Sequence, residues 1–162
     1  MAKIAIISDT HDNLDNIAAA IRVIKQKNAE LIIHAGDFCS PYTAFPFSGI
    51  DIPLIGVFGN NDGDKLALRD KFSDIGEIFD YSHQLIVDGK KILITHYPDL
   101  VESLAKSGDY DFVIFGHTHK LEIYTKGKTT VINPGTLSGD LAQSSTFIVL
   151  DTLTNQTEVI EV

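Results

Sequence analysis

Residues 3–11 read Lys3-Ile4-Ala5-Ile6-Ile7-Ser8-Asp9-Thr10-His11, an apolar run that ends in two potential metal ligands. The run over residues 3–8 predicts a buried strand. Asp9 and His11 stand at positions i and i+2, which in extended backbone places both side chains on one side, about 6.5–7 Å apart. From there they could reach one metal ion, or two ions about 3.5–4 Å apart.

Four further segments repeat this arrangement of an apolar run followed by Asp, Asn or His. Residues 31–35 lead to Gly36-Asp37, and residues 53–58 lead to Gly59-Asn60-Asn61-Asp62. Residues 91–95 lead to His96, and residues 111–115 lead to Gly116-His117-Thr118-His119. Because ligands gather beyond the carboxyl ends of strands in α/β folds, we expect a single site there. Its candidate metal ligands are Asp9, His11, Asp37, Asn60, His96, His117 and His119.

Each candidate also has an ordinary structural interpretation when taken singly. Asp9 could cap a turn or a helix, and a lone His is more often a satisfied hydrogen-bonding residue. Gly36-Asp37 and Gly59-Asn60 could be turns in which the side chain bonds its own backbone. Taken together, the mixture of oxygen and nitrogen donors suits a pair of divalent ions that share one carboxylate and hold a hydroxide between them.

The remaining pattern predicts helices in the first two thirds and hairpins in the last third. Residues 64–72 and 99–107 predict short helices, the second with Leu100, Val101, Leu104 and Ala105 inward and with Gly108 as its stop. Asp88-Gly89 predicts a hairpin turn between residues 84–87 and 91–95. Strands are expected at 121–125, 129–133, 146–150 and 156–161. A longer helix is expected after Asp12 or Asn13 as its cap, with an apolar face formed by Leu14, Ile17, Ala18, Ile21 and Ile24.

This order of elements predicts an α/β (α+β) fold in which two mixed β-sheets are covered by helices, a four-layer αββα sandwich. The 162 residues fit one domain, spanning 1–162. A net charge of −9 argues against a broad nucleic-acid surface. The apolar runs are of strand length, so no membrane span is expected. A signal-peptide core is missing and Cys39 is the single cysteine, which favours the cytoplasm.

The ordered blocks resemble those of the calcineurin-like metallophosphoesterase superfamily. The residues that carry the resemblance are Ser8-Asp9-Thr10-His11, His34-Ala35-Gly36-Asp37, Gly59-Asn60-Asn61-Asp62, Gly116-His117-Thr118-His119 and Asn133-Pro134-Gly135. More narrowly, the chain is similar to the small single-domain YfcE-type phosphodiesterases, whose relatives include the retromer scaffold subunit. Serine hydrolases, P-loop NTPases and Rossmann dehydrogenases are excluded, because G-x-S-x-G, P-loop and G-x-G-x-x-G motifs are missing.

The resemblance implies a metal-dependent phosphoric diester hydrolase with two divalent ions. One ion would be held by Asp9, His11, Asp37 and His119, and the other by Asp37, Asn60, His96 and His117. Asp37 would bridge the ions, and a hydroxide between them would attack phosphorus. Mn²⁺ is the expected metal, with Ni²⁺, Fe²⁺ or Zn²⁺ as alternatives. The expected partners are a small phosphodiester or nucleotide-like substrate and further copies of the chain, in a dimer or tetramer.

Two positions depart from the superfamily pattern. Many members have His where this chain has Asn61, and Asn cannot supply a proton near pH 7. Asn61 and Asp62 are the candidate catalytic residues, with Asp62 expected to orient Asn61 or the turn. His96-Tyr97-Pro98 stands where relatives often have Gly and another His, so the substrate contacts near His96 differ. The alternative functions are a phosphomonoesterase or nucleotide hydrolase, and an interaction scaffold that has lost catalysis.

Overall fold

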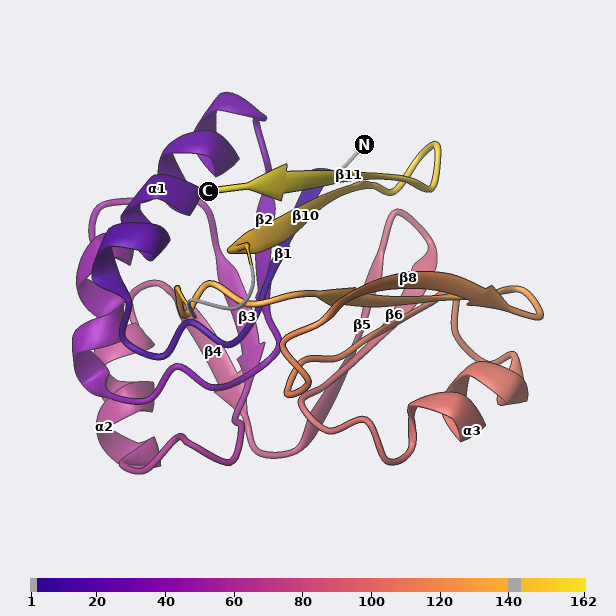
Figure 1. Ribbon diagram of the computed structural model, residues 1–162, viewed down its shortest axis with the longest axis horizontal. Coiled ribbons are helices and arrows are strands. Elements are labelled where there is room, and N and C mark those ends of the chain that lie inside the picture. The colour runs from indigo at the N-terminus through magenta and orange to yellow at the C-terminus, as the bar shows by residue number, and fades with distance from the viewer. Residues whose placement is uncertain (1–2, 140–143) are drawn as a thin grey trace.

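Two β-sheets pack face to face between helices in the computed structural model, which describes residues 3–139 and 144–162 (Figure 1). The first sheet has the strand order β11 (Gln156–Glu161), β10 (Thr146–Asp151), β1 (Lys3–Ile7), β2 (Leu31–His34), β3 (Leu54–Val57) and β4 (Gly76–Phe79). The second has the order β5 (Ser82–Val87), β6 (Lys90–Thr95), β7 (Phe112–Ile114), β9 (Thr129–Pro134) and β8 (Leu121–Lys126).

Both sheets are mixed and contain parallel as well as antiparallel strand pairs. In the first sheet β1, β2, β3 and β4 run parallel, while β10 pairs antiparallel with both β1 and β11. In the second, β6, β7 and β9 run parallel and β5 and β8 are antiparallel. The carboxyl ends of β1, β2 and β3 therefore lie along one edge of the first sheet, and those of β6 and β7 along one edge of the second.

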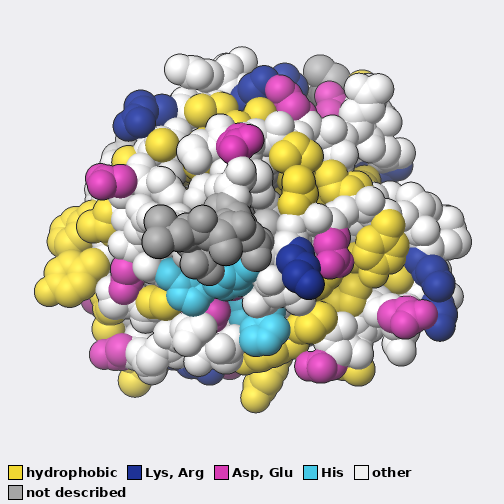
Figure 2. All heavy atoms as spheres, viewed as in Figure 1, with side chains coloured by type: hydrophobic (Ala, Val, Ile, Leu, Met, Phe, Trp, Pro, Cys, Tyr) yellow, Lys and Arg dark blue, Asp and Glu magenta, His cyan; other side chains and the backbone are white. Residues whose placement is uncertain are grey.

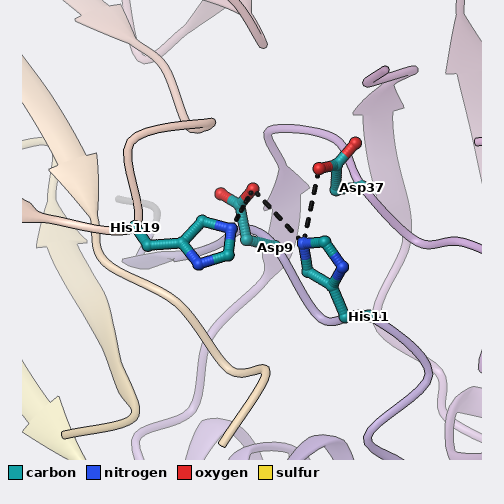
Figure 3. A group of neighbouring side chains, drawn as sticks. All are labelled: Asp9, His11, Asp37 and His119. Atoms are coloured by element: carbon teal, nitrogen blue, oxygen red, sulfur yellow. Dashed lines mark ion pairs between the residues drawn. The ribbon is translucent and has the colours of Figure 1, made fainter. Parts of the chain in front are cut away.

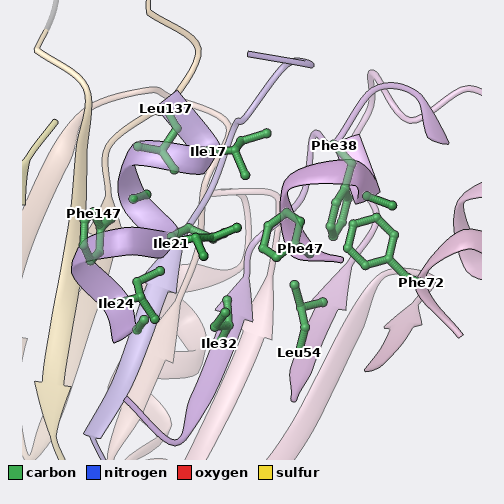
Figure 4. Close-up of a cluster of buried hydrophobic side chains, with 14 of the residues drawn as sticks. Ile17, Ile21, Ile24, Ile32, Phe38, Phe47, Leu54, Phe72, Leu137 and Phe147 are labelled. Carbon is green, nitrogen blue, oxygen red and sulfur yellow. The ribbon is translucent and has the colours of Figure 1, made fainter. Parts of the chain in front are cut away.

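Helices cover the outer faces of both sheets. Helix α1 (Leu14–Gln26), the 3₁₀ helix η1 (Pro41–Phe47) and α2 (Lys65–Phe72) pack on the first sheet, and α3 (Val101–Ser107) packs on the second. Buried side chains such as Ile17, Phe47 and Phe72 fill the layer between helices and first sheet (Figure 4). The alternation of strand side chains completes the layering, because Ala5 and Ile7 face the helices whereas Ile4 and Ile6 pack between the sheets. The predicted four-layer αββα sandwich is confirmed.

The structure decides the cap of α1 and corrects the expected inward face of α3. Asn13 is the N-cap of α1, where its side chain accepts the N–H of Asn16 at 3.1 Å. The Asp12 carboxylate instead accepts from Ser40 and Thr43, so it holds the start of η1. Leu100 precedes the first residue of α3 and is 66% exposed, so the prediction that it points inward was wrong.

Two elements were not predicted from the pattern, namely η1 and β4. The strand β4 has the sequence Gly76-Glu77-Ile78-Phe79, which lacks a β-branched run, and it forms because it pairs with β3. Within the described ranges 3–139 and 144–162, no helix is both long enough and apolar enough to cross a membrane.

Candidate metal centre

Four of the predicted ligands converge where the loops after β1, β2 and β7 meet. Side-chain donor atoms of Asp9, His11, Asp37 and His119 all lie within 4.8 Å of one another. Nε2 of His119 lies 3.3 Å from Oδ1 of Asp9, and Nε2 of His11 lies 3.3 Å from Oδ2 of Asp37. Figure 3 shows the His119 ring turned toward Asp9 and the His11 ring turned toward both Asp9 and Asp37. The first sheet supplies three of these residues and the second sheet supplies His119.

The other three predicted ligands form a second group beside the first. Oδ1 of Asn60 lies 3.0 Å from Nε2 of His96 and 2.8 Å from Nδ1 of His117. The same two ring nitrogens are 3.2 Å apart. Nε2 of His96 lies 3.5 Å from Oδ1 of Asp37, so the two oxygens of Asp37 face different groups. The structure thus brings all seven residues together, with Asp37 between the two sets.

Two buried atoms in the first group test whether these residues fit a metal. Oδ1 of Asp9 and Nε2 of His11 are buried and have no hydrogen-bond partner among the described residues. Leaving buried polar atoms unsatisfied costs about 1–3 kcal/mol each, and a cation between them would remove that cost. Two ligands at about 2.1 Å from one ion lie roughly 3.0–3.4 Å apart, close to the separations within both groups. The donor set therefore fits divalent ions.

The charges of the first group favour a cation as well. Contact with Asp37, and then with Asp9, raises the pKa of His11 to about 10. Burial by itself would raise the pKa of Asp9, but His11, His119 and Ser8 outweigh burial and lower it. The nearby carboxylate of Asp9 raises the pKa of His119. Two buried carboxylates thus draw positive charge, which either protons or metal ions can provide.

Comparison of this chain with known proteins identifies its family. The family model of the calcineurin-like phosphoesterase superfamily domain matches residues 2–155. The chain belongs to this superfamily. It is 40% identical over 154 residues to phosphodiesterase MJ0936 of Methanocaldococcus jannaschii, and the match covers 93% of each chain.

Solved structures of the superfamily share the fold. An archaeal phosphodiesterase superposes with a TM-score of 0.93 at 38% identity, covering 99% of each chain. The phosphoesterase YfcE of E. coli superposes with a TM-score of 0.71 at 16% identity, covering 98% of each chain, which is a likeness of fold. The sequence resemblance to this superfamily is confirmed, and YfcE shares its fold.

The loops that carry the superfamily motifs are not extended, contrary to the expectation for the two i, i+2 pairs. Asp9, His11, His117 and His119 have φ values of 51°, 41°, 70° and 60°, and Asp37 has 60°. These are left-handed conformations that non-glycine residues adopt at a cost of about 1–3 kcal/mol each. The strands end at Ile7, His34 and Ile114, before the ligands, so the donors lie on tight turns. The turns bring Nε2 of His11 to 3.9 Å from Oδ1 of Asp9.

Glycines in the superfamily motifs allow these turns to approach one another. A Cβ atom on Gly59 would collide with Oδ1 and the backbone nitrogen of Asp37. A Cβ atom on Gly116 would collide with the side chains of Ser8 and Asp9. Close packing of these loops therefore explains why glycine precedes Asn60 and His117 in the sequence.

Asn61 and Asp62, the two predicted catalytic residues, both contact the Asp37 loop. Asn61 donates its backbone N–H to Oδ1 of Asp37 at 2.9 Å and its side-chain N–H to Oδ2 at 2.7 Å. The Asp62 carboxylate is buried and accepts the backbone N–H groups of Gly59, Asp37 and Cys39 at 2.6, 3.1 and 2.8 Å. Asp62 thus ties the loop after β2 to the loop after β3, and its position suits the orienting role expected of it.

Several supporting residues were not identified from the sequence. Ser8 donates its hydroxyl to Oδ2 of Asp9 at 2.6 Å, and Thr136 donates to the Asp9 carbonyl at 2.9 Å. Sγ of Cys39 lies 3.4 Å from Nδ1 of His11. Ser8 lies within the first motif, Cys39 follows Asp37 by two residues and Thr136 directly follows Asn133-Pro134-Gly135, so closeness to a motif was the available signal for each. His34, from the motif that contains Asp37, is buried with Nε2 at 3.1 Å from the Thr10 hydroxyl.

Proposed function

We propose that this protein is a metal-dependent phosphodiesterase with two divalent ions. The supporting observation is the position of Asp37, whose two oxygens face two separate groups of donors. One ion would be held by Asp9, His11, Asp37 and His119, and the other by Asp37, Asn60, His96 and His117. The 40% identity to a protein named as a phosphodiesterase favours diesters as substrates.

Buried residues of this chain would bind the ions, and exposed residues would contact the substrate. When bound, the ions would supply a hydroxide nucleophile and neutralise charge on the phosphoryl oxygens. Asp9 and Asp37 are buried, while Asn60 and His117 are exposed, so the substrate phosphate approaches from the Asn60 and His117 side. Asn61 is exposed beside Asp37, where its amide would hydrogen-bond a phosphoryl oxygen, and Asp62 acts as a positioning residue.

Replacing Asp37 by Ala tests the assignment. We expect loss of both ions and loss of bis-aryl phosphate hydrolysis, because Asp37 belongs to both ligand sets. The measurement is metal content after dialysis against chelator and reloading with Mn²⁺, together with turnover. Asp70→Ala is the control, since Asp70 is an exposed residue of α2.

The outcomes separate the rival functions. Retained turnover in Asp37→Ala would refute the ligand assignment. A wild-type chain that binds metal but hydrolyses no monoester, diester or nucleotide would instead be a scaffold of the same fold. Faster turnover of monoesters than of diesters would make it a phosphomonoesterase. Reloading with Mn²⁺, Ni²⁺, Fe²⁺ and Zn²⁺ in turn tests the proposed preference for Mn²⁺, and light scattering tests the proposed dimer or tetramer.

A further inference from the structure

A groove of about 620 Å³ lies on the outer face of the second sheet, where the carboxyl end of β6 meets the start of α3. This volume is in the range of small-molecule sites. Its walls are mainly apolar, formed by Tyr81, Leu93, Tyr97, Leu100, Leu104 and Tyr110.

Tyr97 joins this groove to the metal centre. It follows His96 directly, and its ring lies edge-on to the His96 ring at 5.1 Å between centroids. Its ring centroid is 5.9 Å from that of His117. Thr95, on the other side of His96 in sequence, also lines the groove. A group attached to a phosphate beside His96 and His117 would therefore reach the groove across Tyr97. Figure 2 shows two areas of histidine side chains, and hydrophobic side chains border the lower one.

The groove's composition indicates what kind of group it takes. The described lining residues include no lysine or arginine, and Asp99 contributes a carboxylate, so a second phosphate is disfavoured. Tyr81 and Leu100 are 73% and 66% exposed, and large apolar side chains left exposed around a concavity are typical of a binding site. Tyrosine rings favour planar aromatic partners. Ser82, Thr95 and Asp99 add polar groups that could accept or donate hydrogen bonds.

We propose that this groove binds an uncharged, planar aromatic group esterified to the phosphate at the metal centre, either a nucleobase or an aryl ring. The inference rests on the proposed function for the position of the phosphate. It makes Tyr81, Tyr97 and Leu100 specificity-determining residues, because they lie between the metal centre and the groove or at its exposed rim.

Three phosphonates that the enzyme cannot hydrolyse test the proposal. Methyl-, cyclohexyl- and phenylphosphonate present the same anionic head to the metal centre and differ only in the organic group. Their inhibition constants are measured against bis-aryl phosphate hydrolysis by the metal-loaded enzyme. We expect phenylphosphonate to bind about three- to tenfold more tightly than methylphosphonate. Nucleoside monophosphates form a further arm, in which binding tighter than phenylphosphonate identifies the group as a nucleobase and weaker binding identifies it as an aryl ring.

Variants at the rim of the groove test whether the groove causes the preference for phenylphosphonate. Tyr81→Ala and Leu100→Ala both change exposed residues. In each variant the inhibition constant of methylphosphonate divided by that of phenylphosphonate should fall toward one. Tyr124→Ala, on the exposed side of β8 and outside the groove, is the matched control and should keep the preference. Equal binding of phenyl- and methylphosphonate, equal binding of phenyl- and cyclohexylphosphonate, or an unchanged preference in both rim variants would each overturn the proposal.

Calorimetry on the metal-loaded protein distinguishes this result from failure of the proposed function. The three phosphonates and the variants are compared by binding alone, so the groove is tested even if no diester is hydrolysed. A phenyl preference without turnover would retain the groove and reject the phosphodiesterase. Turnover without a phenyl preference would retain the phosphodiesterase and reject the groove.

Discussion

His11 and Asp37 form an ion pair that makes the stability of the metal-free protein depend on pH. The pKa of His11 is raised from 6.5 to about 10, so its contribution is fully present below pH 6.5 and is lost as pH rises through 10. The pKa of Asp37 is lowered from 3.8, although burial opposes this, so its contribution is lost as pH falls through that lowered pKa. We therefore expect the melting temperature of chelator-treated protein to fall between pH 6.5 and 10. Circular dichroism measures it, and His11→Gln should flatten that slope.

Asn61 predicts how the rate depends on the leaving group. An amide cannot protonate a departing oxygen near pH 7, so the leaving group must depart as an unprotonated alkoxide or phenoxide. A series of aryl diesters of increasing phenol pKa should show a steep fall in the rate of the chemical step, measured by single-turnover kinetics. A flat dependence would show that another group supplies the proton. Asn61→His, which introduces an imidazole, should make the slope shallower.

The loop between β3 and α2 offers a matched test of close packing. Gly59→Ala would drive a methyl group into Asp37, whereas a Cβ on Gly63 meets no atom within 4 Å. We expect Gly59→Ala to weaken metal binding at least tenfold and to lower the free energy of unfolding by about 1–3 kcal/mol. Gly63→Ala should change neither by much. Calorimetric metal titration and urea unfolding measure the two effects, and equal behaviour of the variants would contradict the packing argument.

The elements show what sequence patterns can and cannot predict. Strands with continuous apolar runs, such as β1 and β2, and the helical periodicity of α1 were predicted because burial alone specifies them. The strand β4 was missed because its pairing with β3 comes from tertiary contact. The sequence left Asp12 and Asn13 as alternative caps of α1 because they are adjacent, and only the position of η1, which Asp12 contacts, decides between them.

The sequence pattern predicted which residues the structure brings together, but it did not predict their backbone geometry. An Asp, Asn or His after each apolar run marks a strand end, and parallel strands bring those ends together. The left-handed φ values of Asp9 and His11 depend on contacts with the Asp37 loop, including the bond from the Thr10 N–H to the Asp37 carbonyl at 3.0 Å. Such contacts between distant segments leave no local pattern.

At the scale of the whole molecule, the candidate ligands connect the two sheets. Asp9 and Asp37 follow strands of the first sheet, whereas His96, His117 and His119 follow strands of the second. Bound ions would therefore hold the sheets together as well as support catalysis. We expect Mn²⁺ at 100 times its dissociation constant to stabilise the fold by about 2.7 kcal/mol for each ion bound, measured as a rise in melting temperature. Asp37→Ala should show no such rise, and a rise in that variant would indicate binding elsewhere.

The left-handed turns beneath the ligands have an evolutionary consequence. Asp9, His11, Asp37, His117 and His119 occupy conformations in which glycine is relaxed, and two of them are buried acids close together. Replacing one of these acids with glycine relieves backbone strain and carboxylate repulsion in the metal-free chain, which offsets part of the stability lost with its ion pair and hydrogen bonds, so the loss of turnover carries a reduced folding penalty. A lineage freed from selection for hydrolysis would then keep the sandwich and discard its ions. Descendants that serve as binding scaffolds are the expected result.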